Sequence, residues 1–394
     1  MKKVAIIGGG ASSLIIADFL SGTFEVTIYE KEKSIGRKFL VAGKGGFNLT
    51  NEVVGKKLTS SYSPLSFLDQ SLNNFDSSKT RQWLNSLGIP TFVGSSGRVF
   101  PEKDIKPIQV LEAIKLSLQK KHVKILPHHT FIGFDKNKKP RIRHKEQELT
   151  IDADFVVFTL GGASWSQTGS DGTWTKLFDQ IGIKCISFQP SNCGINVNWS
   201  KGFIKYHSGK PLKNISLTVN KTTIKGEALI TDYGLEGNAI YPSIPEIRDQ
   251  LNLENSALLT IDFKPNNSLE QLKSKISTSI KTKEYEKTFN LHKIEFALLK
   301  AYTNKDEFCN PEVFVKKIKS LRIPIESLRP IEEAISTIGG VPIKELNQNF
   351  SLKKIPNLFV AGEMINWDAP TGGFLLQGCF STGYSVAQSI LRLS

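Results

Sequence analysis

The chain has 394 residues, more than the roughly 100–200 residues of one typical domain, which predicts more than one domain. Hydrophobic residues make up 39% of it, and no run approaches the roughly 18 apolar residues of a membrane span, so we expect a globular protein and no membrane partner. The net charge of +14 is spread along the chain, and its densest basic stretch, residues 136–145, lacks aromatic residues for base stacking. These features favour a solvated basic surface and disfavour a nucleic-acid partner.

The first element along the chain is predicted to be a strand, a glycine turn and a helix. The apolar residues 4–7 lead into a turn in which Gly8, Gly10 and Ser13 occupy the positions of the pattern G-x-G-x-x-G/A. Gly8 allows the tight turn and Gly10 lets the backbone approach a pyrophosphate, whereas Ser13 is small but imperfect for close helix packing. This geometry places a pyrophosphate on free backbone N–H groups at the helix start.

A second short strand, residues 25–30, follows the helix and ends in Glu30, twenty residues after Gly10. A carboxylate at this offset is expected to bind the ribose hydroxyls of an adenosine. The alternative is a glycine-rich turn in an ordinary βαβ unit. The succession of strand, helix, strand and acid favours the dinucleotide site.

The next 140 or so residues alternate between irregular and regular segments. Residues 31–51 are rich in glycine and predict a loop wrapped against the cofactor. Helices are expected over 76–88, with Asp76 as its cap, and over 105–120. Strands are expected over 123–126, 148–151 and 154–160, the last one buried and followed by a glycine turn at Gly161 and Gly162.

Beyond Pro190 the pattern changes. Short alternating runs over 191–263 are typical of an antiparallel β domain. Helices are then expected over 269–280, 293–301, 311–318 and 331–335. We therefore predict three parts: a cofactor domain formed by 1–190 and 336–394, an inserted β domain over 191–265, and a helical subdomain over 266–335.

The C-terminal segment reads as the second half of the cofactor site. A strand over 357–361 ends at Gly362 and Glu363, and a glycine pair at 372 and 373 opens the last helix. A nicotinamide-only dehydrogenase has no need of this element, whereas the ribityl chain and flavin of FAD extend beyond the first βαβ unit. The pairing of the two chain ends therefore argues for a flavoprotein that binds FAD.

Several of these segments together resemble the HI0933-like flavoproteins, the BaiN/YhiN or aminoacetone oxidase-like group. The matching segments are 36–51, 97–101, 160–165, 169–172, 361–363 and 371–373. The resemblance implies an α/β fold: a Rossmann-like FAD-binding domain of the two-dinucleotide-binding flavoprotein type, with an inserted antiparallel β domain and a helical subdomain. It also implies an FAD-dependent oxidoreductase.

Carried over by motif, the resemblance assigns the ADP half of FAD to the first glycine turn and Glu30. It assigns the pyrophosphate and flavin to the loop after residue 36, and the ribityl chain and flavin edge to the C-terminal segment. The start of the last helix would face the pyrimidine side of the flavin. The residues expected to bind FAD are Gly8, Gly10, Ala11, Ser12, Ser13, Glu30, Lys31, Arg37, Lys38, Gly43, Lys44, Gly45, Gly46, Phe47, Asn48, Gly161, Gly162, Gly362, Glu363, Thr371, Gly372, Gly373 and Phe374.

Residues that act on substrate are harder to identify, and no catalytic set is assigned. The polar or aromatic groups expected near the flavin are Lys44, Asn48, Trp367, Asp368 and Gln377. For any single one of them a structural role is favoured, such as holding a loop or packing a junction. Tyr206, His207 and Tyr233 in the inserted domain are weaker candidates for the substrate side.

Three functions remain open from the sequence. The first is a reductase that takes hydride from NAD(P)H and reduces a small organic molecule at a double bond or carbonyl; no second G-x-G-x-x-G follows a strand, so NAD(P)H would bind only transiently. The second is an amine or aminoketone oxidase that uses oxygen. The third is a flavoprotein with a nucleic-acid-binding role, prompted by the net charge.

The four cysteines have neither C-x-x-C nor metal-ligand spacing, so we expect no dithiol relay and no metal. Cys379, in the last helix near the expected flavin site, is interpreted as a packing residue first. The N-terminal glycine triplet, Asp18 and the lack of a small-residue cleavage site argue against a signal peptide. A cytoplasmic location is therefore expected, and the oligomeric state stays open.

Overall fold

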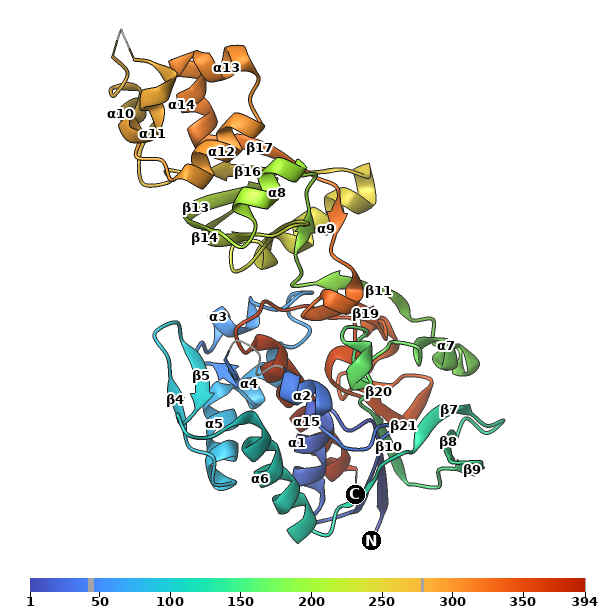
Figure 1. Ribbon diagram of the computed structural model, residues 1–394. Helices are drawn as coiled ribbons and strands as arrows, with labels where there is room; N and C mark the ends of the chain where they lie inside the picture. Colours follow the sequence, from blue (N-terminus) through green and yellow to red (C-terminus); the bar gives the residue numbers. More distant parts are fainter. Residues whose placement is uncertain (42–45, 278–279, 394) are drawn as a thin grey trace. The chain divides into compact units, whose positions relative to one another are not determined.

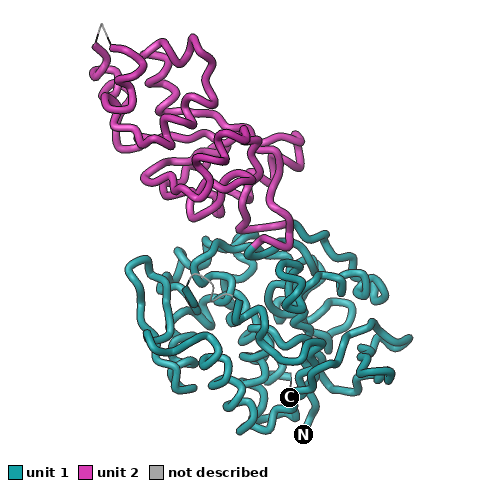
Figure 2. The backbone as a smooth tube through the Cα atoms, in the orientation of Figure 1, with its two compact units in different colours: residues 1–189, 335–394 teal, residues 190–334 magenta. Residues whose placement is uncertain are grey.

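The computed structural model describes residues 1–41, 46–277 and 280–393 (Figure 1). The chain divides into two compact units (Figure 2). Unit 1 comprises Met1–Gln189 and Ile335–Ser394, and unit 2 is Pro190–Ala334. None of the helices described in these ranges is long and apolar enough to cross a membrane.

Unit 1 is built on a six-stranded sheet with the order β20-β21-β10-β1-β2-β6. The strands β1 (Lys3–Ile7), β2 (Glu25–Tyr29), β6 (Lys124–Leu126), β10 (Phe155–Phe158) and β21 (Ile355–Val360) pair in parallel, and β20 (Ser351–Leu352) is antiparallel at the edge. All four residues of β10 are buried, as expected for the middle of a covered parallel sheet. The carboxyl ends of β1, β10 and β21 therefore lie side by side.

Two helices from opposite ends of the chain pack together beside this sheet (Figure 1). They are α1 (Ala11–Leu20) and α15 (Phe374–Arg392). Their contact is close because α15 presents a glycine there: a Cβ on Gly383 would lie 2.6 Å from Cγ2 of Ile15. Each helix follows a parallel strand of the same sheet, so both begin at its carboxyl edge.

A buried carboxylate ties α1 to two further helices, α5 (Ser77–Ser86) and α6 (Pro107–Lys120). Asp18 accepts hydrogen bonds from Nε1 of Trp83 at 3.0 Å and from Oγ of Ser117 at 3.0 Å. Nζ of Lys121 lies 2.7 Å from the same carboxylate. The predicted cap of α5 is present as well, because Asp76 accepts from the backbone N–H of Lys79.

Three smaller sheets complete unit 1. The first, β3-β5-β4, is formed by β3 (Thr50–Asn51), β5 (Arg98–Pro101) and β4 (Thr91–Val93). The second is β7 (Thr130–Phe134), β8 (Pro140–His144) and β9 (Gln147–Thr150), and the third pairs β11 (Ile186–Ser191) with β19 (Ser336–Gly340). The short helices of this unit are α2 (Arg37–Val41), α3 (Lys56–Thr59), α4 (Asp69–Asn74) and α7 (Thr175–Phe178).

Unit 2 holds a seven-stranded antiparallel sheet with the order β17-β16-β13-β14-β15-β12-β18. Its strands are β12 (Ile195–Asn196), β13 (Pro211–Val219), β14 (Thr222–Ile230), β15 (Gly234–Glu236), β16 (Ala257–Asp262), β17 (Leu321–Ile325) and β18 (Ser327–Leu328). Its helices are α8 (Lys201–His207), α9 (Ile244–Glu254), α10 (Leu269–Lys273), α11 (Tyr285–Thr288), α12 (Lys293–Ala301), α13 (Lys305–Cys309) and α14 (Pro311–Lys319). Sheet and helices share one hydrophobic core.

The structure differs from the sequence-based expectation in several places. The helix expected over 269–280 ends at Lys273, and residues 331–335 contain only the 3-10 turn Ile331–Glu333. The loop expected over 31–51 contains the helix α2. The regions expected as separate β and helical parts, 191–265 and 266–335, form one unit because β17 and β18 join the sheet of β12–β16.

Candidate functional site

The first glycine turn joins β1 to α1 in a conformation that requires glycine. Gly8 has a φ of +103°, and a Cβ there would lie 2.5 Å from the carbonyl oxygen of Thr159. A Cβ on Gly10 would meet only that same oxygen, at 3.8 Å, so its other side is open. The N–H of Ser13 already donates to the carbonyl oxygen of Gly10 at 3.1 Å, whereas the N–H groups of Ala11 and Ser12 precede the first intrahelical hydrogen bond. The turn is therefore suited to a phosphate group.

The third position of the pattern is occupied by Ser13, whose side chain is buried in the protein. The Ser13 hydroxyl donates to the carbonyl oxygen of Gly10 at 2.6 Å, and the residue is fully buried. Ser12, beside it, donates to the carbonyl oxygen of Cys379 at 3.0 Å. Both hydroxyls are thus used within the protein, which leaves the backbone N–H groups of Gly10, Ala11 and Ser12 as the donors of this turn available to a ligand.

Glu30 lies at the end of β2 and braces the same turn. Its carboxylate accepts from the N–H of Gly9 at 2.6 Å and from the N–H of Glu32 at 2.8 Å. Burial raises the pKa of Glu30, while these two N–H groups oppose the rise. A carboxylate offers about four acceptor positions, so two remain for hydroxyl donors. This arrangement fits the expected contact with ribose.

Three cations expected at the cofactor site, all within the described residues, are paired with carboxylates. Lys31 lies 2.5 Å from Asp171, and Lys38 lies 3.0 Å from Glu363. Arg37 forms an ion pair with Glu32 and also donates to the carbonyl oxygen of Gln167 at 2.9 Å. These pairs connect the segment after β2 with the 169–172 segment and with the C-terminal segment.

A second glycine turn follows β10. A Cβ on Gly161 would lie 2.7 Å from Oγ of Ser170, and one on Gly162 would lie 2.2 Å from Oγ1 of Thr337. The Thr337 hydroxyl accepts from the N–H of Ala163 at 3.1 Å. The turn is therefore tightly packed against neighbouring protein atoms. It lies at the carboxyl end of β10, the strand next to β1 in the sheet.

A third glycine turn follows β21 and packs against α1. Gly362 has a φ of +79°, and a Cβ there would lie 2.4 Å from Oγ of Ser12. Ser12 is the second residue of α1, whereas its partner Cys379 is the sixth residue of α15. At about 1.5 Å per residue, α15 begins roughly 6 Å beyond the start of α1. The two helix starts are thus staggered along one side of the sheet.

The start of α15 is enclosed by the segment 46–51. A Cβ on Gly373 would lie 2.3 Å from the carbonyl oxygen of Thr50, and Asn51 donates to the carbonyl oxygen of Gly372 at 3.1 Å. With its amide oriented to satisfy both ends, Asn48 accepts from the N–H of Gly373 at 2.9 Å and donates to the carbonyl oxygen of Gly46 at 3.3 Å. Hydrogen bonds therefore hold the segment 46–51 against the start of α15.

Two aromatic residues of the expected site lie in the packing beneath this loop. Phe47 is buried against Phe39, with 5.0 Å between ring centroids. Phe374 is also buried, and its carbonyl oxygen accepts from the hydroxyl of Tyr62 at 2.6 Å. Thr371 is half-buried. Gly43, Lys44 and Gly45 lie outside the described residues.

Gln377 has its hydrogen-bonding capacity filled by the protein. Its carbonyl accepts from the hydroxyls of Thr50 at 2.5 Å and Thr80 at 3.0 Å. Its amide donates to the carbonyl oxygen of Phe75 at 2.7 Å and to Oγ of Ser381 at 3.0 Å. With 0% of its surface exposed, the side chain has no group left for a substrate.

Trp367 and Asp368 are likewise buried in the scaffold. Nε1 of Trp367 donates to the carbonyl oxygen of Gly362 at 2.9 Å, and its ring lies 5.8 Å from that of Tyr62. Asp368 exchanges two backbone hydrogen bonds with Ser63 and accepts from the N–H of Ala369 at 2.9 Å. Of the described candidates expected near the flavin, Asn48 alone is half-buried, and it lies at the helix start.

The candidates in unit 2 have separate surroundings. The Tyr233 hydroxyl donates to Glu236 at 2.5 Å, and the Arg329 guanidinium lies 4.0 Å above its ring. Burial raises the pKa of Tyr233, and the Glu236 carboxylate adds to the rise. Tyr206 is 65% exposed. Burial, with the Lys210 charge as a smaller cause, lowers the pKa of His207.

The cysteines behave as thiols. Within the described residues they form no disulfide, and no cluster of three His, Cys, Asp or Glu side chains could hold a metal. Burial raises the pKa of Cys379 to about 12, and the Glu363 carboxylate adds to it. Burial also raises the pKa of Cys185 to about 12. Neither is a nucleophile near neutral pH.

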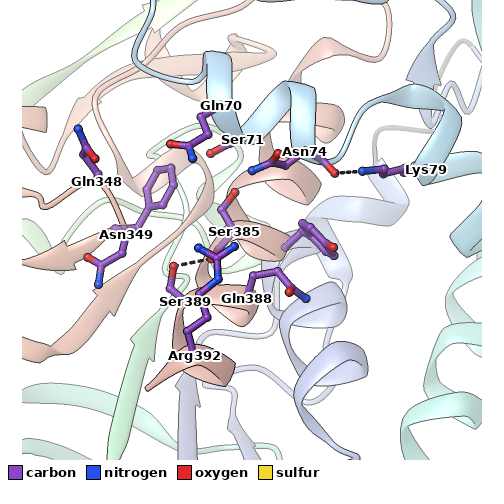
Figure 3. Close-up of a pocket in the computed structure, with 12 residues that line it drawn as sticks. Gln70, Ser71, Asn74, Lys79, Gln348, Asn349, Ser385, Gln388, Ser389 and Arg392 are labelled. Atoms are coloured by element: carbon purple, nitrogen blue, oxygen red, sulfur yellow. Dashed lines mark hydrogen bonds between the residues drawn. The ribbon is translucent and has the colours of Figure 1, made fainter. Parts of the chain in front are cut away.

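A polar cavity of about 350 Å³ lies at the other end of α15 (Figure 3). Its wall includes Gln70 and Asn74 from α4 and Ser385, Ser389 and Arg392 from α15. Figure 3 shows the Ser389 hydroxyl bonded within this wall, to the Ser385 carbonyl oxygen at 2.8 Å. None of the described residues expected to bind FAD lines this cavity, so it is not part of the glycine-turn site.

One arginine beside the start of α15 was not among the residues expected from the sequence. Arg98, the first residue of β5, lies opposite Asn51 in the β3–β5 pair. A Cβ on Gly372 would lie 3.5 Å from its Nε. The segment 97–101 carried part of the resemblance, but nothing in its local sequence indicates that it reaches the C-terminal helix.

Comparisons with known proteins agree with this architecture. The chain is 24% identical to a 3-dehydro-bile acid delta(4,6)-reductase from Clostridium scindens, over 98% of both chains. It is 22% identical to the ribosomal RNA dihydrouridine synthase of Escherichia coli, over 98% of this chain and 97% of that protein. Among solved structures it is similar to a 3-ketosteroid-delta4-(5alpha)-dehydrogenase from Rhodococcus jostii RHA1. That match has a TM-score of 0.51 and 13% identity over 98% and 96% of the two chains.

The family model described as the HI0933-like protein Rossmann domain matches residues 2–389. This match and the observed sheets confirm the expected α/β fold class, a Rossmann-like FAD-binding domain with additional antiparallel sheets. They also confirm the resemblance inferred from the motifs. The chain belongs to the HI0933-like family.

Proposed function

We propose that this protein is an FAD-dependent reductase that takes hydride from NAD(P)H and reduces a carbon–carbon double bond of a small organic molecule. The observation that carries the proposal is the meeting of three glycine turns at the carboxyl ends of β1, β10 and β21. Ligands of open parallel sheets bind outside the carboxyl ends of the strands. FAD is long enough to extend from the start of α1 to the start of α15.

The residues present fit the two ends of FAD. At α1 the open side of Gly10 and the N–H groups of the first turn would hold the pyrophosphate, and Glu30 would accept from the ribose hydroxyls. At α15, a helix of 19 residues, the first turn carries partial positive charge. It would face the pyrimidine edge of the flavin, the part that becomes more negative on reduction.

The protein's own charges support this placement. Lys31 and Lys38 are already paired with Asp171 and Glu363, so the pyrophosphate would depend mainly on backbone N–H groups. The Lys38–Glu363 pair links α2 to the third glycine turn, which keeps the two halves of the site in register. When bound, FAD would take a hydride from NAD(P)H and pass a hydride to one carbon of the substrate, while a proton completes the second.

We propose a carbon–carbon double bond as the group that is reduced because of the names of two related proteins. A delta(4,6)-reductase and a dihydrouridine synthase are both named for adding hydrogen across carbon–carbon double bonds of a ring. The oxidase alternative, acting on an amine or aminoketone, has no such support among these names. Peroxide formation under air with a reducing substrate separates the two activities, because an oxidase returns its electrons to oxygen.

The test is a spectrum of the purified protein followed by anaerobic addition of NADPH and then NADH. A yellow protein that bleaches at a catalytic rate and is reoxidised by a conjugated enone, without peroxide, supports the proposal. A yellow protein that stays oxidised contradicts the NAD(P)H step. A colourless protein that takes up no added FAD contradicts the whole cofactor assignment.

A second candidate function is the same reduction on a base of RNA, and a feature of unit 2 favours it. Residues 190–226 contain six lysines and no acidic residue. All six are exposed, and none forms an ion pair within the described residues. In the basic stretch 136–145, by contrast, Lys139, Arg141 and Arg143 pair with Asp152 and Glu148.

Salt-dependent binding of a structured ribosomal RNA fragment tests this candidate. Neutralising Lys205, Lys210 and Lys213 should weaken binding and reduce its salt dependence by roughly one counterion for each phosphate that these lysines neutralise in the wild type. Neutralising Lys136, Lys138 and Lys145 in the other stretch is the charge-matched control. An equal effect in both triple variants, or no binding at all, contradicts a site on unit 2.

A further inference from the structure

Arg98 runs alongside the start of α15. It pairs across the β3–β5 ladder with Asn51, and the Asn51 amide donates to the carbonyl oxygen of Gly372 at 3.1 Å. A Cβ placed on Gly372 would lie 3.5 Å from Nε of Arg98. Backbone pairing therefore places Arg98 beside the glycine pair that opens the helix, with its Nε close to Gly372.

The charge of Arg98 has no partner in the part of the chain that the structure describes. The other cations of this site that the structure describes are matched: Lys31 with Asp171, Arg37 with Glu32, and Lys38 with Glu363. Residues 42–45, which lie outside the description, contain no acidic residue in the sequence. Arg98 is half-buried, and removing a cation from water without a partner is unfavourable. A negative group supplied by a ligand would restore the balance.

A second source of positive potential lies beside it. Gly373 is the N-cap of α15 and contributes no side-chain cap, so the N–H groups of the first turn point outward unpaired within the helix. The side-chain oxygen of Asn48 accepts from the N–H of Gly373 and leaves the further N–H groups of the first turn free. The N–H groups at the start of α15 and the Arg98 guanidinium thus both create positive potential close to Gly372.

We propose that Arg98 stabilises the negative charge of the reduced flavin at its pyrimidine edge and so raises the flavin's reduction potential. This inference rests on the FAD site proposed above. Two electrons and one proton, delivered as hydride, leave a flavin whose extra negative charge is spread over N1 and the neighbouring carbonyl oxygen. A guanidinium beside that edge favours the reduced form electrostatically.

The stagger of the two helices separates this role from pyrophosphate binding. The pyrophosphate belongs at the start of α1, and α15 begins roughly 6 Å further along, as derived from the Ser12–Cys379 bond. Arg98 lies on the α15 side of the site, next to Gly372. Its contribution should therefore appear in the redox equilibrium of the flavin more than in retention of FAD.

The test compares Arg98→Gln, Arg98→Lys and Arg81→Gln as FAD-loaded proteins. Arg81→Gln is the control because this substitution also removes one positive charge from the same region. Nε of Arg81 donates to Thr91 of β4, in the sheet that contains β5. The readouts are the reduction potential by dye equilibration and the affinity for sulfite, whose adduct also places negative charge on the flavin. Both are independent of turnover.

Arg98→Gln should lower the ratio of reduced to oxidised flavin by about tenfold, which is about 30 mV for a two-electron couple. Sulfite binding should weaken by a similar factor, Arg98→Lys should stay close to the wild type, and Arg81→Gln should not differ from it. If Arg98→Gln loses FAD but the flavin that remains has the wild-type potential, the residue serves the pyrophosphate and the inference is wrong. An unchanged potential and unchanged retention also overturn it. Wild-type protein that binds no FAD would instead refute the proposed function itself.

Discussion

The hydroxyl of Ser12 donates to the carbonyl oxygen of Cys379 across 367 positions of sequence. This bond joins the second residue of α1 to α15, and Gly362 fits against the same serine with no room for a side chain. It makes the two ends of the chain one structural element. The glycine turns that each end contributes are therefore fixed relative to each other before any cofactor binds, which is the preorganisation that tight binding needs.

Gly362→Ala should destabilise the protein. The added Cβ would lie 2.4 Å from Oγ of Ser12, and the φ of +79° is one that alanine adopts only with strain of about 1–3 kcal/mol. Thermal unfolding should show a lower Tm, and FAD should be held less firmly because the third turn shifts. Gly22→Ala is the control, since nothing lies within 4 Å of a Cβ there. An equal Tm for the two variants would contradict the packing described here.

Glu30→Gln should weaken FAD binding by about 10- to 100-fold. The carboxylate accepts from Gly9 and Glu32, and an amide cannot accept on both sides and also serve two ribose hydroxyls. Fluorescence titration of the apoprotein with FAD measures the effect. Glu25→Gln is the matched control, because Glu25 lies at the opposite end of the same strand and pairs with Lys124 at the surface. If Glu25→Gln lost affinity for FAD and Glu30→Gln did not, the ribose assignment would be refuted.

Gln377→Leu should lower the free energy of unfolding by about 3 kcal/mol without changing the chemistry of folded, FAD-loaded protein. The substitution leaves the hydroxyls of Thr50 and Thr80 and the Phe75 carbonyl oxygen without their buried partner. Urea unfolding gives the stability, and single-turnover flavin reduction gives the chemistry. Gln388→Leu, on the outer part of the same helix, should be nearly neutral. A kinetic defect in stable Gln377→Leu protein would restore its catalytic candidacy.

The glycine turns and Glu30 were predictable because each depends on a short stretch of sequence. Gly8, Gly10 and Glu30 stand at spacings that one βαβ unit imposes, and the Asp76 cap is a local signal of the same kind. The strand over residues 321–325 lies inside the region predicted as a helical subdomain, and no strand was predicted there. Their alternation is that of a strand, but it follows directly on the helix α14 and contains Pro324.

The roles of Gln377 and Arg98 could not be derived from local sequence. Gln377 is satisfied by residues about 300 positions away, and Arg98 meets Gly372 only because β3 and β5 carry it there. A buried amide and a polar candidate for catalysis look alike in sequence. What distinguishes them is the number of hydrogen-bonding positions already filled, and tertiary contacts decide that number.

Cys379 should be protected from thiol reagents in the native state and should make the protein less stable in alkali. Burial raises the pKa of Cys379 to about 12, from 9.0 for the free thiol. Between these values the unfolded chain has lost a proton that the folded chain retains, so the free energy of unfolding falls as pH rises above about 9. The exposed Cys309 should react rapidly at pH 8, while Cys379 reacts only after unfolding.

Mass-spectrometric mapping of labelled cysteines, with and without urea, measures this protection. Cys379→Ala should reduce the loss of stability between pH 9 and pH 10.5, and Cys185, whose pKa burial also raises to about 12, should account for part of the loss that remains. Rapid native labelling of Cys379 would mean that the contact between α1 and α15 opens readily. The two glycine turns would then not be fixed relative to each other, and their preorganisation could not explain FAD binding.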